Sequence, residues 1–159
     1  MSFFRSRKEA PVRPNFLLEC KDLVRHYGKI KPVDGVNLNL RPHELLSILG
    51  PSGCGKSTLL NLIAGLDEPQ AGEIFIGGEE MSSVHRIVAP ELRRVGMVFQ
   101  DIALFPHLNV FKNVAYGLNV SRDAKRLRVD EMLKLVELSG SEKKMPHELS
   151  GGEQQRIAI

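Results

Sequence analysis

The sequence predicts an α/β fold, and three observations support this expectation. The apolar run at residues 44–49 is typical of a buried strand, and it ends at a glycine-rich loop. Residues 56–64 follow this loop directly and have the pattern of a buried helix. Strand-like segments prevail before Gln100 and helix-like segments after it, which makes this position a candidate subdomain boundary.

The part of the chain before Gln100 is predicted to be rich in strands. Val36, Leu38 and Leu40 alternate with asparagines, so their strand should bury one face. A glycine pair at 77–78 predicts a turn after one of the strands. The expected strands cover residues 16–23, 36–40, 44–49, 73–76 and 95–99.

Three segments are predicted to be helical or to connect helices. The helix at 56–64 should end at Gly65 and pack deeply, because its aliphatic residues leave almost no polar face. A loop is expected at 101–108. Helices are expected at 110–118 and 122–138, and the charged face of the second should meet solvent.

Composition excludes several classes of protein. The 159 residues are 42% hydrophobic and 26% charged, which is ordinary for a soluble globular chain. A net charge of +3 without a basic stripe interleaved with aromatics argues against a nucleic-acid partner. No apolar run has the length of a membrane span. Cys20 and Cys54 lie far apart, so both are expected to be reduced thiols in a cytosolic protein.

The glycine-rich loop matches the pattern Gly-x-x-x-x-Gly-Lys-Ser between a strand and a helix, which predicts a phosphate-binding loop. Gly53 and Gly55 allow the backbone to approach phosphates, and the helix start adds partial positive charge. Lys56 should contact the β- and γ-phosphates, and the Ser57 hydroxyl should bind Mg²⁺. Catalysis by the Cys54 thiol is not expected, because no basic neighbour is evident. The predicted nucleotide-binding residues are Gly50, Pro51, Ser52, Gly53, Cys54, Gly55, Lys56, Ser57 and Thr58.

A second motif lies near the end of the sequence, at 149–153. Ser150 stands where a helix is expected to begin, and two glycines after it expose the backbone. Such a helix N-terminus is suited to bind an anion. With the phosphate loop, this motif makes the chain resemble the ATP-binding subunits of ABC transporters from residue 16 to residue 159. The resemblance is closest to importers of the ferric-iron, polyamine and sugar type.

The resemblance implies the roles of the second motif and the full architecture. Leu149, Ser150, Gly151, Gly152 and Glu153 correspond to the family's signature, which usually ends in Gln, and would contact the ATP bound to a second subunit. The active unit would be a head-to-tail dimer, expected to be a homodimer, with two ATP molecules and Mg²⁺. The implied fold is a P-loop NTPase with a RecA-like core, an antiparallel β subdomain and a helical subdomain, incomplete at the C-terminus.

Further residues match positions of known role in this family. Tyr27 would stack on adenine, and the alternative for this residue alone is a tyrosine that only packs. Gln100 would act in catalysis with Lys56 and reach Mg²⁺ and the attacking water. The apolar residues of the loop 100–107 (Gln100 to His107) would contact a membrane permease subunit. His43 replaces the usual glycine and would carry a backbone cost if the turn requires a positive φ.

The expected organisation is a disordered basic tail at 1–15 and a partial ATP-binding domain at 16–159. The domain divides into a β-rich nucleotide-binding part at 16–99, a helical subdomain at 100–149, and the signature with its helix start at 150–159. Such a subunit would be cytoplasmic and peripheral on the inner face of the cell membrane.

The family's Asp-Glu strand and histidine switch have no counterpart in this sequence, so the chain is expected to be a fragment. Loss of a general base costs about 10²–10⁴-fold in rate, so hydrolysis by the chain alone should be negligible. Two alternatives stay open. A soluble ABC-type ATPase of DNA maintenance is disfavoured by the compact spacing of the two motifs, and a non-hydrolysing nucleotide-binding module would require a naturally complete chain.

Overall fold

The computed structural model describes residues 16–159, which form two compact units, one ending at Gly96 and the other beginning at Met97. Each unit has a hydrophobic core of its own. The basic tail predicted at 1–15 lies outside the described residues. Within residues 16–159, the helices are all too short or too polar to cross a membrane.

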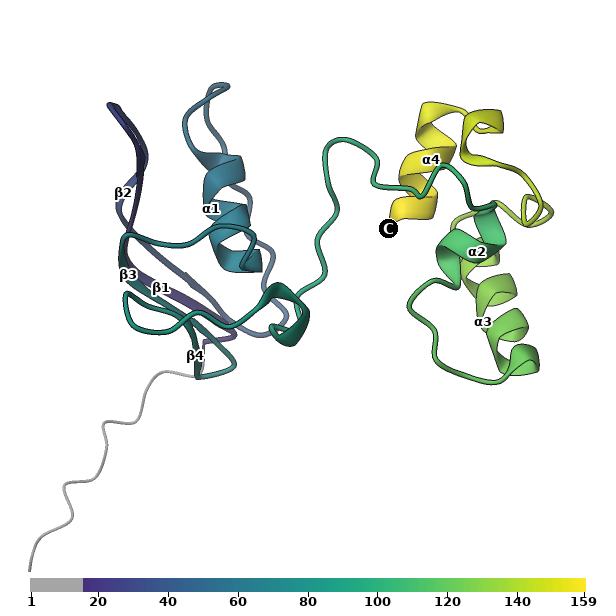
Figure 1. The fold of residues 1–159 in the computed structure, drawn as a ribbon, viewed down its shortest axis with the longest axis horizontal. Coiled ribbons are helices and arrows are strands. Elements are labelled where there is room, and N and C mark those ends of the chain that lie inside the picture. Colours follow the sequence, from purple (N-terminus) through teal and green to yellow (C-terminus); the bar gives the residue numbers. More distant parts are fainter. Residues whose placement is uncertain (1–15) are drawn as a thin grey trace, which may run out of the picture. The chain divides into compact units, whose positions relative to one another are not determined.

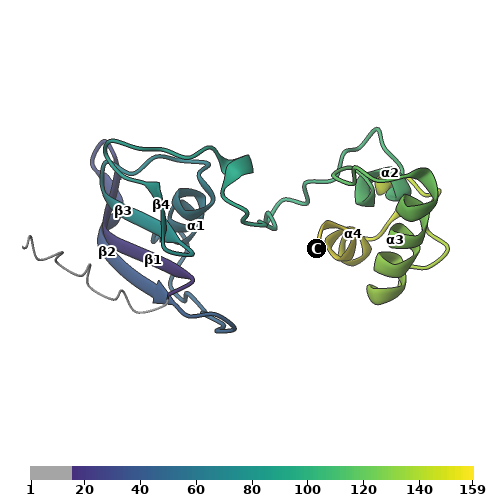
Figure 2. The same ribbon diagram turned by 90° about the horizontal axis from the view of Figure 1, so that it is seen from below.

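The first unit contains a four-stranded antiparallel sheet with the order β2-β1-β3-β4 (Figure 2). The strands predicted at 16–23, 36–40 and 73–76 are confirmed as strands, and each extends beyond or shifts from its expected range. The turn at Gly77 and Gly78 is also confirmed, with both residues at positive φ. The strands are β1 (Leu18–Tyr27), β2 (Ile30–Leu40), β3 (Ala71–Ile76) and β4 (Glu79–Ser82), and the last was not expected because its sequence is polar.

Helix α1 (Lys56–Ala64) covers one face of this sheet (Figure 1). Its predicted bounds are confirmed, and so is its end at Gly65, which adopts a left-handed conformation with φ of 81°. Leu60 is exposed, so the helix is less completely buried than its composition suggested. The core between α1 and the sheet consists of Cys20, Leu23, Val33, Leu59, Leu62, Ile63, Ile74 and Met81.

Two predicted strands are wrong. Residues 44–49 and 95–99 form no strand, and Leu45 and Leu49 are 92% and 90% exposed. A strand is defined by hydrogen bonds to a neighbour, and a buried parallel strand needs a crossover connection to reach one. Within residues 16–159 every strand pair is antiparallel, and these two segments join none of them. Their apolar pattern is compatible with a buried strand, but such a strand forms only where a neighbouring strand is available for hydrogen bonding.

Arg93 is the largest fully buried side chain in the described part of the chain, with 1% exposure. Its guanidinium donates to the carbonyl oxygens of Leu62 and Ile63 at 2.9 and 3.1 Å, at the end of α1. It also donates to Val88 O at 2.8 Å and to Ser82 Oγ at 2.6 Å. Burial lowers the pKa of this guanidinium, and its partners are uncharged. The negative end of the α1 dipole supplies the compensating charge.

The second unit is helical, as expected, with α2 (Val110–Val114), α3 (Arg122–Leu135) and α4 (Gly151–Ala158). Both α2 and α3 end earlier than the ranges 110–118 and 122–138 predicted. Glu137 adopts a positive φ of 59° just beyond α3, which breaks the helical path. The core of this unit consists of Val110, Ala115, Val129, Leu133, Leu138 and Leu149.

His43 has a φ of 63°, so the turn after β2 does require the left-handed conformation that glycine adopts without cost. The turn is held by the Glu44 N–H, which donates to Arg41 O at 3.2 Å, and by the Arg41 N–H, which donates to the Glu44 carboxylate at 2.8 Å. The condition for the expected backbone cost at His43, a positive φ, is therefore met.

Replacing Arg93 should destabilise the first unit. We expect Arg93→Met to lower the free energy of unfolding by roughly 2–4 kcal/mol, because it leaves buried carbonyl and hydroxyl oxygens without donors. Urea denaturation followed by circular dichroism measures this change. The matched control is Arg94→Met at the exposed neighbouring position. Equal losses in the two variants would contradict a special role for the buried guanidinium.

Relieving the strain at His43 should stabilise the chain. We expect His43→Gly to raise the free energy of unfolding by up to about 1 kcal/mol, since glycine removes the left-handed penalty but adds entropy to the unfolded state. At exposed His85, which has no positive φ, the same change to glycine should be destabilising. Thermal unfolding of both variants measures these changes. A lower unfolding temperature for His43→Gly than for wild type would contradict a backbone strain at His43.

Candidate functional site

The predicted phosphate loop leads directly into α1. Gly53 and Gly55 have φ values of 80° and 100°, a region that only glycine occupies without strain. A Cβ at Gly55 would collide with the carbonyl oxygen of Pro32 in β2, so glycine is required there by space as well. A Cβ at Gly53 would meet nothing within 4 Å, so the loop is open at this point.

Lys56 folds back over the loop that precedes it. Its Nζ donates to Gly50 O at 2.8 Å and to Pro51 O at 2.7 Å. These two bonds hold the ammonium group over the loop. There it can exchange its two carbonyl acceptors for the oxygens of a phosphate. The same Nζ lies 3.5 Å from Cys54 Sγ, so the expectation that Cys54 has no basic neighbour is wrong.

The donor set of this loop fits a polyphosphate with a divalent cation. Ser57 is exposed in the first turn of α1, where a hydroxyl can bind a cation, and Thr58 follows it. The first backbone N–H groups of a helix have no acceptor within the helix, and they point out of its N-terminus. The loop and the first turn of α1 therefore offer backbone donors, the Lys56 ammonium and the Ser57 hydroxyl to such a ligand.

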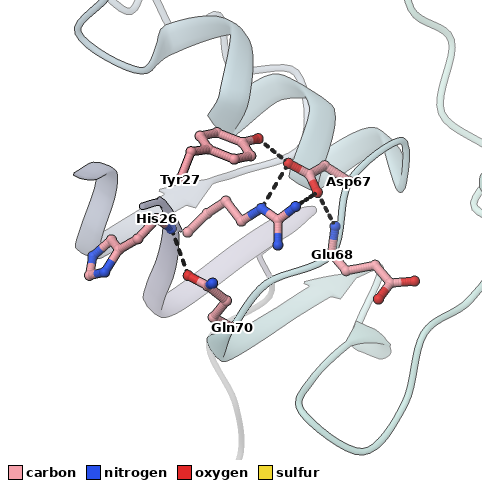
Figure 3. Close-up of polar contacts among 6 residues, drawn as sticks. His26, Tyr27, Asp67, Glu68 and Gln70 are labelled. Atoms are coloured by element: carbon pink, nitrogen blue, oxygen red, sulfur yellow. Dashed lines mark hydrogen bonds and ion pairs between the residues drawn. The ribbon is translucent and has the colours of Figure 1, made fainter. Parts of the chain in front are cut away.

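Tyr27 ends β1 and is 46% exposed. Its hydroxyl donates to the carboxylate of Asp67, which follows the end of α1 (Figure 3). Arg25 forms an ion pair with the same carboxylate, with NH2 at 2.7 Å from Oδ1. Sequence reasoning missed Arg25 and Asp67 because no motif marks them and 42 positions separate them. Only the folding of α1 onto the sheet brings them together.

Gln100 lies in the second unit, exposed at a bend. The loop that follows it is held by the Asn113 side chain, which accepts from the Phe105 N–H at 2.8 Å and donates to Leu108 O at 2.8 Å. Phe105 is 38% exposed and packs against Tyr116, with ring centroids 4.3 Å apart. The loop therefore presents an aromatic side chain from a fixed backbone, and Asn113 is a residue that sequence reasoning missed.

The helix start predicted at Ser150 is confirmed, since Ser150 is the N-cap of α4. Its Oγ accepts from the Glu153 N–H at 3.3 Å, and its own N–H donates to the Glu153 carboxylate at 2.8 Å. The Ser150 hydroxyl also donates to this carboxylate at 2.7 Å. Leu149 is buried in the core and anchors the motif, while Gly151 and Gly152 are exposed.

The chain is similar to several known proteins. A profile of the ABC transporter family matches residues 33–159. The sulfate/thiosulfate import ATP-binding protein CysA of Neisseria meningitidis is 46% identical over 149 residues, covering 89% of this chain and 41% of that protein. The spermidine/putrescine import ATP-binding protein PotA of Clostridium acetobutylicum is 46% identical over 151 residues, covering 93% and 42%.

Solved structures agree with this similarity. A dimeric structure of MJ0796, a bacterial ABC transporter cassette, has a TM-score of 0.78 and 37% identity, covering 89% of this chain and 67% of that chain. A post-hydrolysis state of the same cassette bound to ADP and Pi has a TM-score of 0.76 and 36% identity, covering 89% of this chain and 66% of that one.

This chain belongs to the ABC transporter family, whose ATP-binding cassettes hydrolyse ATP. The predicted α/β class of a P-loop NTPase is confirmed by the match to the solved cassettes. The chain spans 41% of the length of the CysA protein that it matches.

The cap of α4 should make stability depend on pH. Hydrogen bonds from the Ser150 hydroxyl and N–H hold the pKa of Glu153 below the ordinary glutamate value of about 4.3. Because the unfolded chain binds this proton more readily, the stabilisation is complete above about pH 4.3 and is lost as pH falls through the lower folded pKa. We expect Glu153→Gln to unfold at a lower temperature than wild type at pH 7, and the difference to shrink at pH 3. A difference independent of pH would contradict the charged cap.

Proposed function

We propose that this chain is the ATP-binding part of the subunit that energises an import system, and that it binds ATP at residues 50–58. The observation that carries the proposal is the geometry of the loop at the start of α1. Gly53 and Gly55 adopt positive φ, a Cβ at Gly53 would meet nothing within 4 Å, and the Lys56 ammonium folds back over the loop to Gly50 O. The names of the relatives, which are import ATP-binding proteins, support the transport role.

In this proposal Lys56 exchanges its bonds to Gly50 O and Pro51 O for the β- and γ-phosphate oxygens of ATP. The Ser57 hydroxyl would bind Mg²⁺, and the bound cation would neutralise phosphate charge. The family resemblance gives the same role to Gln100, which belongs to the second unit. Lys56 and Gln100 are the residues proposed to act in catalysis, the second by orienting water. The ring of Tyr27, which is half exposed at the end of β1, would stack on adenine.

The signature residues 149–153 are proposed to contact the ATP of a second subunit in a head-to-tail dimer. The exposed glycines and the N-terminus of α4 suit a phosphate, because the backbone N–H groups and the helix dipole attract an anion. The dimeric structure of the similar cassette MJ0796 supports such a pairing. Glu153 brings a negative charge to this helix start, so we infer that it weakens anion binding relative to Gln.

The loop 100–107 is proposed to dock on a membrane permease subunit, which would place the protein at the inner face of the cell membrane. Phe105 is exposed and held by Asn113, as a preformed contact requires. CysA and PotA relatives are equally similar to this chain, yet their names give sulfate and polyamines as cargo. The similarity of this chain to its relatives therefore does not distinguish between these cargoes.

ATP binding should depend on the Lys56 ammonium. We expect Lys56→Ala to raise the Kd for ATP measured by calorimetry on the full chain by about 10-fold or more, because a charge-assisted hydrogen bond contributes about 1.5–3 kcal/mol. The matched control is Lys143→Ala, at an exposed position of the second unit, which should leave the Kd unchanged. Unchanged affinity in Lys56→Ala would show that the loop is not the phosphate site.

A further inference from the structure

The end of β1 and the loop after α1 meet at one carboxylate, that of Asp67. We call Arg25, Tyr27 and Asp67 the Asp67 cluster, which Figure 3 shows together with His26, Glu68 and Gln70. All of these residues belong to the first unit. The cluster lies beyond the C-terminal end of α1, the helix whose N-terminus begins at the phosphate loop. It is therefore connected to that loop through one short helix.

Four donors satisfy the Asp67 carboxylate. Its Oδ2 accepts from Arg25 Nε at 3.1 Å and from the Tyr27 hydroxyl. Its Oδ1 accepts from the Glu68 N–H at 2.8 Å and forms an ion pair with Arg25 NH2 at 2.7 Å. The Arg25 contact is bidentate, which fixes orientation as well as distance. These contacts leave the carboxylate little freedom to release the Tyr27 hydroxyl.

The Tyr27 ring is held at a second point. The guanidinium carbon of Arg25 lies 4.8 Å from the ring centroid, so the cation covers one face of the ring. The hydroxyl is tied to Asp67, and the side chain as a whole is 46% exposed. A free tyrosine at the end of a strand would sample several rotamers. Here one rotamer is selected, and a large part of the aromatic surface still faces outward.

The loop at residues 67–70 is held to β1 by two hydrogen bonds of Gln70. The Gln70 side chain accepts from the His26 N–H at 2.6 Å, and the Gln70 N–H donates to Val24 O at 2.8 Å. Residues 67–70 therefore follow β1 on either side of Arg25. This double attachment ties the loop that carries Asp67 to the end of β1 that carries Tyr27.

We propose that Asp67 and Arg25 are positioning residues that hold the Tyr27 ring ready to stack on a purine base. This inference rests on the proposed function, which places the base of ATP on Tyr27. Ordering a side chain on binding lowers affinity, and an aromatic ring fixed in advance avoids that cost. Asp67 and Arg25 therefore raise the affinity for nucleoside triphosphates without contacting the base themselves. They do not change the affinity for a ligand that lacks a base.

The test compares two ligands, ATP and inorganic tripolyphosphate, by calorimetry on the full chain. We expect Asp67→Ala and Tyr27→Phe to weaken ATP binding by about threefold to tenfold, as the loss of one preordered side chain predicts. Both variants should bind tripolyphosphate as wild type does, because the phosphate loop is unchanged. Tyr27→Phe keeps the ring and removes only the hydroxyl, so it gives an answer even if Asp67→Ala does not fold. The control Glu79→Ala removes an exposed carboxylate of the same unit and should change neither affinity.

A double-mutant cycle separates positioning from a direct contact. If Asp67 acts through the ring, adding Asp67→Ala to Tyr27→Ala should cause no further loss of ATP affinity. An equal loss for ATP and tripolyphosphate, additive losses in the cycle, or wild-type ATP affinity in Asp67→Ala and Tyr27→Phe would overturn the inference while leaving the phosphate site in place. A wild-type chain that binds neither ligand would overturn the proposed function itself, and the inference with it.

Discussion

The packing of the first unit depends on the buried guanidinium of Arg93. Arg93 joins the end of α1 to β4 and to the segment after it, through the carbonyl groups of Leu62, Ile63 and Val88 and the hydroxyl of Ser82. A Cβ at Gly65 would collide with its guanidinium, so even the helix cap is shaped to receive it. Because α1 carries the proposed phosphate loop at its other end, this contact helps to position that loop relative to the sheet, together with the apolar core.

Both ends of α1 are used. At its N-terminus, Gly53 and Gly55 adopt positive φ, the Pro32 carbonyl leaves no room for a Cβ at Gly55, and Lys56 folds back over the loop. Beyond its C-terminus, Asp67 holds Arg25 and Tyr27. In the proposed function these are the phosphate and the base ends of one ligand. A single helix, packed on the sheet through Leu59, Leu62 and Ile63, would then set both.

The signature region follows a different physical rule, since it is stabilised locally. Ser150 and Glu153 satisfy each other's backbone donors within one turn, and Leu149 fixes the turn to the core of the second unit. This arrangement keeps Gly151 and Gly152 exposed on an ordered helix start. A charged Glu153 strengthens the cap but opposes an incoming anion, so the residue links the stability of α4 to its proposed role.

The features that depend on local chemistry could be predicted from the sequence: α1 and its end at Gly65, the turn at Gly77, the cap at Ser150, and the unfavourable backbone position of His43. Each follows from a backbone conformation or hydrogen bond made within a few residues. The tertiary structure decided whether apolar runs become strands, because residues 44–49 and 95–99 find no neighbour to pair with. It alone revealed Arg93 and the Asp67 cluster, since their partners are distant in sequence and are chosen by packing rather than by pattern.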